Sequence, residues 1–111
     1  MPLRFEVSRE TLIVRVDGEM DLNSAGAFRH EIDKKLDELR PLNLLIDLGG
    51  VTFIDSSGLG VILGRYKRVA QRGGRMAITK AQPTVRRILE LSGLMRVMGI
   101  YRDELGALND L

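Results

Sequence analysis

The stretch that decides the fold is Val51-Thr52-Phe53-Ile54-Asp55-Ser56-Ser57-Gly58-Leu59-Gly60, where an apolar segment meets polar residues and glycines. Asp55 or Ser56 suits the N-cap of a helix, because their side-chain oxygens accept hydrogen bonds from free amides. We predict a helix from about Ser57 to Gln71. Its expected buried stripe is Leu59, Ile62, Leu63, Tyr66 and Val69, with Arg65, Lys67, Arg68 and Arg72 outside it.

The segment before this stretch predicts a strand and a crossover helix. Leu42 to Leu48 is a nearly continuous apolar run, typical of a strand covered on both faces, and a loop is expected from Gly49 to Asp55. An amphipathic helix precedes it, capped by Asn23 or Ser24 and ended by Pro41, with its stripe at Phe28, Ile32, Leu36 and Leu39. Because that helix can serve as a crossover, the strand is expected to run parallel to an earlier one.

The two ends of the chain supply the remaining elements. Arg4 to Val7 and Thr11 to Asp17 predict a pair of antiparallel strands at a sheet edge. Later elements are a strand from Arg75 to Lys80, a helix from Pro83 that Gly93 ends, a strand from Val97 to Tyr101 and a helix from Asp103 to Asn109. The order ββαβαβαβα predicts an α/β fold, with a mixed sheet of about four or five strands and about four helices. We expect one domain, residues 1–111.

Composition excludes several classes of site. The 111 residues contain no cysteine and a single histidine, His30, so disulfides and thiolate metal sites are impossible and we expect no metal site. A net charge of +2 does not suggest a nucleic-acid-binding face. No signal peptide or long apolar run is visible, so we expect a cytoplasmic protein without membrane contact, and a monomer.

Two alternatives to a binding module are an enzyme and a nucleotide-binding domain. Ser57 could be an enzyme's nucleophile, but the G-x-S-x-G pattern is missing and the sole histidine, expected at the surface, lies on the first helix. The chain could also be a nucleotide-binding domain, since it has suitable glycines, but the phosphate-loop pattern is missing. Asp21, Asp47 and Asp55 are capping or loop residues, or else an acidic cluster around Ser57. The arginines around Arg65 form a solvated face or a docking surface for an acidic partner or a nucleotide's phosphates.

The adjacent serines point instead to modification. One cap needs one oxygen, whereas three polar side chains precede Gly58. A phosphate on Ser57 would add a charge of about −1.5 to −2 at the positive end of a helix, which the module itself tolerates. A partner packed there would have to bury that charge. The pattern therefore favours a phosphorylation switch on a protein-binding module.

The run from Phe53 to Lys67 closely resembles the signature of STAS-domain anti-sigma factor antagonists, especially the sporulation type. Gly18-Glu19-Met20-Asp21 is similar to that family's first junction, and Leu45-Ile46-Asp47-Leu48 to its central strand. The predicted order of elements agrees with a STAS domain over nearly the whole chain.

The resemblance implies an anti-sigma factor antagonist that is not itself an enzyme. Its partner would be an anti-sigma factor that is also a serine kinase, bound so that a sigma factor is released. That kinase would use ATP, which belongs to the partner and not to this chain, to phosphorylate Ser57 and so inactivate the antagonist. A serine phosphatase acting on phospho-Ser57 would restore it. The alternative is a STAS regulator of another partner-switching pathway, such as the general stress response.

The residues expected to touch the partner cluster around the modified serine. The resemblance implies that Asp21 and Asp55 flank it, and that the chain has no catalytic residue or cofactor of its own. The expected partner-binding set is Asp21, Asp55, Ser56, Ser57, Gly58, Leu59, Gly60 and Arg65.

Overall fold

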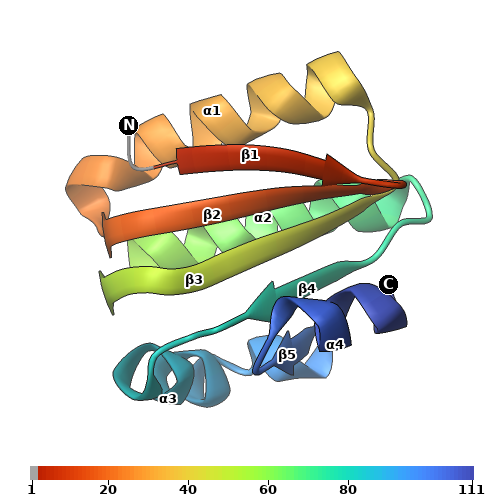
Figure 1. Ribbon diagram of the computed structural model, residues 1–111. Helices are drawn as coiled ribbons and strands as arrows, with labels where there is room; N and C mark the ends of the chain where they lie inside the picture. Colours follow the sequence, from red (N-terminus) through yellow and green to blue (C-terminus); the bar gives the residue numbers. More distant parts are fainter. Residues whose placement is uncertain (1–2) are drawn as a thin grey trace.

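A mixed sheet with the strand order β1-β2-β3-β4-β5 forms the centre of the computed structural model, which describes residues 3–111 (Figure 1). The predicted order ββαβαβαβα is confirmed. In chain order the elements are β1 (Leu3–Ser8), β2 (Thr11–Met20), α1 (Leu22–Leu39), β3 (Asn43–Ile54), α2 (Ser56–Gln71), β4 (Met76–Thr79), α3 (Pro83–Ser92), the 3-10 turn η1 (Leu94–Arg96), β5 (Gly99–Tyr101) and α4 (Glu104–Asp110).

Strand pairing follows the predicted topology. β1 is the antiparallel edge strand beside β2, and β2, β3, β4 and β5 run parallel to one another. Because the crossover helices return the chain to the same end of the sheet, the carboxyl ends of β2 and β3 lie together, where α1 and α2 begin (Figure 1). This edge of the sheet therefore brings together two helix starts that are far apart in sequence.

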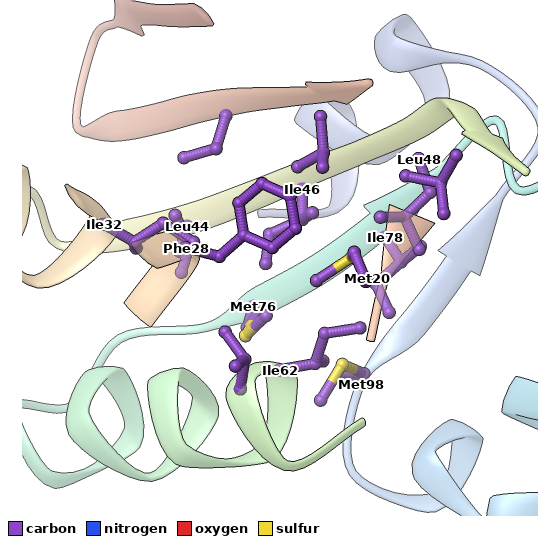
Figure 2. Close-up of a cluster of buried hydrophobic side chains, with 14 of the residues drawn as sticks. Met20, Phe28, Ile32, Leu44, Ile46, Leu48, Ile62, Met76, Ile78 and Met98 are labelled. Atoms are coloured by element: carbon purple, nitrogen blue, oxygen red, sulfur yellow. The ribbon is translucent and has the colours of Figure 1, made fainter. Parts of the chain in front are cut away.

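The main core lies between the sheet and the helices α1, α2 and α3. Side chains of alternate strand residues point into it, and Figure 2 shows Phe28 and Ile62 from the helices among strand residues such as Ile46. A second, smaller cluster covers the opposite face, where Ala107 of α4 packs against Ile13, Leu45 and Ala77. β3 is thus buried on both faces, as its apolar run predicts.

Both central strands are longer than predicted. β2 continues past Asp17 to Met20, and β3 continues through the expected loop at Gly49 to end at Ile54. Gly49 and Gly50 do not break β3, because the pairing of β2 with β3 continues through a register shift between Arg15 and Asp17. Gly50 lies close to β2 there, since a Cβ at this position would collide with the Asp17 carboxylate. The extension matters for the site, since it pairs Met20 with Ile54 immediately before the two helices.

The predicted helical stripes need three corrections. Leu39 is 48% exposed and Leu63 is 37% exposed, whereas Arg65, expected outside the buried stripe, is 8% exposed. The buried face of α2 consists of Gly58, Val61, Ile62, Arg65 and Val69, which share one side of a 3.6-residue period. Arg65 can be buried on that side because it forms an ion pair with Asp33 of α1. The apolar periodicity of the sequence does not reveal such a contact.

Within residues 3–111, none of the helices combines the length and the apolar character that crossing a membrane requires.

Gly58 sets how closely α2 approaches the sheet. A Cβ at this position would collide with the Met20 carbonyl oxygen and lie 2.8 Å from Ile54 Cγ1. We expect Gly58→Ala to lower the free energy of unfolding by about 1–3 kcal/mol, the usual cost of overpacking. Urea unfolding followed by circular dichroism measures this change. A variant as stable as the wild type would show that α2 can move away from β2 without cost.

Candidate functional site

The candidate site is the edge of the sheet where α1 and α2 start. Asp21 follows the last residue of β2 and is the N-cap of α1, and Asp55 follows the last residue of β3 and is the N-cap of α2. Both acids therefore act as caps, one of the two roles predicted for them, and the structure also brings them to one edge. Asp47 is not part of this group, because its carboxylate lies 3.8 Å from Arg15 Nε and 3.8 Å from Lys80 Nζ.

The Asp55 carboxylate joins the two helix starts. Its Oδ1 accepts hydrogen bonds from the amides of Ser57 at 2.8 Å and Gly58 at 3.2 Å. Its Oδ2 accepts a hydrogen bond from the Leu22 amide at 3.3 Å, and the Asp55 amide donates to the Met20 carbonyl oxygen at 3.2 Å. One residue thus links the start of α2 to α1 through its side chain and to the end of β2 through its backbone amide.

Asp21 forms a capping box at the start of α1. Its Oδ1 accepts from the Ser24 amide at 3.1 Å, and the Asp21 amide donates to Ser24 Oγ at 3.0 Å. The prediction that Asn23 or Ser24 is the N-cap is therefore wrong: Ser24 is the third helical residue and completes the box. Hydrogen bonds from Ser24, its amide first, and from the Asn23 amide hold the pKa of Asp21 below its ordinary value, because they favour the ionised carboxylate.

The two serines have different surroundings. Ser56 is exposed at the first position of α2, whereas Ser57 is half-buried at the second. Since Asp55 caps the helix and takes the Ser57 amide, the Ser57 hydroxyl is not needed for capping. Ser57 lines a groove of about 530 Å³ between α1 and α2.

Of the other predicted site residues, three directly follow the serines and Arg65 lies farther along α2. Gly58 is buried beneath the site, Leu59 is partly buried against the core, and Gly60 is exposed in the groove. Arg65 is farther along α2 than the serines, with its Nε 3.0 Å from Asp33 Oδ1. His30 is an exposed residue of α1, as expected.

Two exposed apolar residues near the site are absent from the predicted partner-binding set. Leu22, 77% exposed, is the first residue of α1 and lines the groove with Ser57, and Phe53, 47% exposed, is near the end of β3. A signal for Leu22 exists, because it falls off the stripe formed by Phe28 and Ile32. Phe53 gives no such signal, since the irregular end of β3 hides which face it takes.

The Asp21 cap predicts a pH-dependent contribution to stability. Its pKa is depressed in the folded chain, so its contribution is present above the ordinary aspartate pKa of 3.8 and is lost as the pH falls through the folded value. We expect Asp21→Ala to lower the urea midpoint at pH 7, and this deficit to shrink as the pH falls below 3.8. A deficit that stays constant down to pH 2 would show that the carboxylate charge does not stabilise α1.

Comparison with known proteins places this geometry in a family. The model of the STAS domain matches residues 3–107. An anti-sigma F factor antagonist from Paenibacillus polymyxa is 40% identical over 111 residues, which cover 100% of this chain and 95% of that protein.

Two solved structures share the fold: the anti-sigma factor antagonist SpoIIAA in its unphosphorylated form, and the Bacillus cell fate determinant SpoIIAA in its phosphorylated form. The unphosphorylated form is 29% identical with a TM-score of 0.82, and covers 97% of this chain and 94% of its own. The phosphorylated form is 28% identical with a TM-score of 0.74, and covers 97% of each chain. The family model covers nearly the whole chain and the fold is shared with these structures, so this chain belongs to the STAS domain family.

Proposed function

We propose that this STAS domain is an anti-sigma factor antagonist of the sporulation type, switched off by phosphorylation of Ser57. Its unphosphorylated form binds an anti-sigma factor that is also a serine kinase, and this binding releases a sigma factor. The similarity to the Paenibacillus polymyxa antagonist over the whole chain supports the class of partner. The observation that carries the switch is that Asp55 caps α2, so the Ser57 hydroxyl is not needed as a cap, and that Ser57 lines the groove.

Phosphorylation would change the surface more than the fold. Ser57 is only half-buried, so a phosphate can extend into solvent without displacing the core. Its amide is already bonded to Asp55, and the capping carboxylates of Asp55 and Asp21 are at the same edge. A charge of about −1.5 to −2 would therefore be added to an acidic edge, and a partner docked there would have to desolvate it.

The chemistry of the switch belongs to the partners. The Ser57 Oγ attacks the γ-phosphorus of ATP in the kinase site, the bond to the β,γ-bridging oxygen breaks and ADP leaves, while the kinase holds the metal and accepts the hydroxyl proton. A serine phosphatase reverses the modification by hydrolysis. This chain then needs no cofactor or catalytic residue of its own, and it works as a monomer in the cytoplasm, where the transcription machinery is.

The site fits an enzyme's nucleophile poorly. A serine nucleophile needs a base within hydrogen-bond reach, and the sole histidine of the sequence is an exposed residue of α1. The nearby carboxylates of Asp21 and Asp55 are engaged by helix amides. Their arrangement supports a substrate of phosphorylation more than a catalytic site.

Incubation with ATP and the anti-sigma factor kinase of the same genome tests the modified residue. We expect one phosphate per chain, mapped to Ser57 by mass spectrometry, and no phosphate on Ser57→Ala. Ser56→Ala is the matched control, and it should be phosphorylated like the wild type. A phosphate found on Ser56, or a Ser57→Ala variant that is still modified, would contradict the proposal.

Binding and unfolding together test the switch. Ser57→Ala should bind the kinase as the unphosphorylated wild type does, whereas Ser57→Asp should bind at least about ten-fold more weakly. A desolvation cost of about 1.4 kcal/mol for the added carboxylate is enough for a ten-fold loss of affinity. The melting temperature of Ser57→Asp should change little, because the side chain is outside the core. Calorimetric titration and thermal unfolding give both numbers. A Ser57→Asp variant that unfolds would show that the serine is structural.

A further inference from the structure

Three glycines inside helices have no packing reason in the folded chain. Gly26 of α1 and Gly60 and Gly64 of α2 would carry a Cβ with no atom within 4 Å. Glycine in a helix interior lowers stability relative to alanine, because its backbone loses more freedom on folding. Gly58 differs, since its Cβ would collide with Met20. The three open glycines therefore lower stability without improving any contact in this chain.

All three line the same groove, from both of its walls. The groove of about 530 Å³ lies between α1 and α2, with Leu22 and Ser57 among its other lining residues. Side chains four residues apart form the ridges by which helices pack, and Gly60 and Gly64 remove such a ridge. The result is a surface that another helix can approach down to the backbone.

Arg65, which also lines this groove, supplies an independent sign of a ligand. Its side chain is 9% exposed, and its Nε forms an ion pair with Asp33 Oδ1 at 3.0 Å. Neither that Nε nor the buried Nη1 donates a hydrogen bond to an acceptor among residues 3–111. Arg68 takes the same carboxylate, with its Nη1 3.2 Å from Asp33 Oδ1. A buried guanidinium N–H without an acceptor is costly, and a carboxylate is the group that best satisfies it.

The two charged side chains that line the groove are both arginines. Arg29, which is exposed on α1, lines it together with Arg65. Burial lowers the pKa of Arg65, the Asp33 carboxylate opposes this shift, and the neighbouring Arg29 and Arg68 add to it. Each wall of the groove thus has an arginine and at least one glycine. An occupant that complements it is acidic and has a smooth helical face.

We propose that this groove receives an acidic helix of the anti-sigma factor, which packs over Gly26, Gly60 and Gly64 and brings a carboxylate to the Arg65 guanidinium. The inference rests on the proposed function, because it takes its partner from there. It also explains how the modification acts: Ser57 lines the same groove, so its phosphate repels the acidic helix that the arginines attract.

Stability of the free chain is the first test and needs no partner. Gly26→Ala, Gly60→Ala and Gly64→Ala should each raise the melting temperature by about 2–5 °C, since alanine favours the helix and meets open space. Gly58→Ala, the control, should lower it. Open-glycine variants that melt earlier than the wild type would show that these glycines serve the fold, and would overturn the inference.

Binding is the second test, with the purified anti-sigma factor kinase of the same genome as the probe. Gly60→Leu and Gly64→Leu should weaken binding at least about ten-fold, whereas Ala70→Leu, on α2 but not lining the groove, should bind like the wild type. If the wild type itself fails to bind, the proposed function is wrong. If the wild type binds and both leucine variants bind equally well, the groove is not the docking site although the function stands.

The salt dependence of binding tests the carboxylate. Arg65→Met should bind at least about five-fold more weakly than the wild type, with a smaller loss of affinity between 50 and 300 mM salt, roughly the range in which ion pairs become screened. Lys67→Met, an exposed charge on the same helix, is the control and should keep the wild-type affinity. An unchanged salt dependence in Arg65→Met would show that no carboxylate meets Arg65.

Discussion

The structure depends on one carboxylate that serves two helices. Asp55 accepts hydrogen bonds from amides at the start of α2 with one oxygen and from the Leu22 amide of α1 with the other. Each helix start has amides without partners inside its own helix, and burying them unpaired is costly. Because β2 and β3 end side by side, one residue can satisfy donors from both helices. That geometry fixes where α1 and α2 stand, and so shapes the groove between them.

The proposed phosphorylation switch requires that this edge keep its shape when Ser57 is modified. A hydroxyl that capped its own helix would alter the fold when modified, whereas here Asp55 does the capping and Ser57 lies beside it. The modification can then change the charge of a binding surface while the surface keeps its shape. The same argument applies along the groove. The open glycines lower helix stability and the buried Arg65 guanidinium has an N–H without an acceptor, and the proposed partner helix would pack over the glycines and supply that acceptor.

Much of this architecture could be predicted from the sequence, because the signals are local. Period-two and helical patterns, together with Pro41 and Gly93, place the elements, and a crossover helix implies a parallel strand. The errors have a common cause in tertiary contacts. Gly49 and Gly50 predict a loop, but a shifted register of pairing with β2 places them in β3. Arg65 is predicted to be solvated, but its ion pair with Asp33 of α1 allows it to be buried. Capping was one of two roles predicted for Asp21 and Asp55, and the cap of α1 was expected at Asn23 or Ser24 instead. The bond from the Leu22 amide to Asp55 joins positions 33 residues apart and could not be foreseen.

The most direct test of a rigid switch is an NMR comparison of the unphosphorylated and kinase-phosphorylated chains, each with and without the unlabelled anti-sigma factor kinase. We expect phosphorylation to shift amide signals near Ser57 while those of β2, β3 and the main core stay in place. Without phosphate, the kinase should perturb Leu22, Gly60 and Gly64, and with phosphate these perturbations should disappear. Core amides that shift throughout β2 and β3 on phosphorylation would show that the switch works by changing the fold, which contradicts the account.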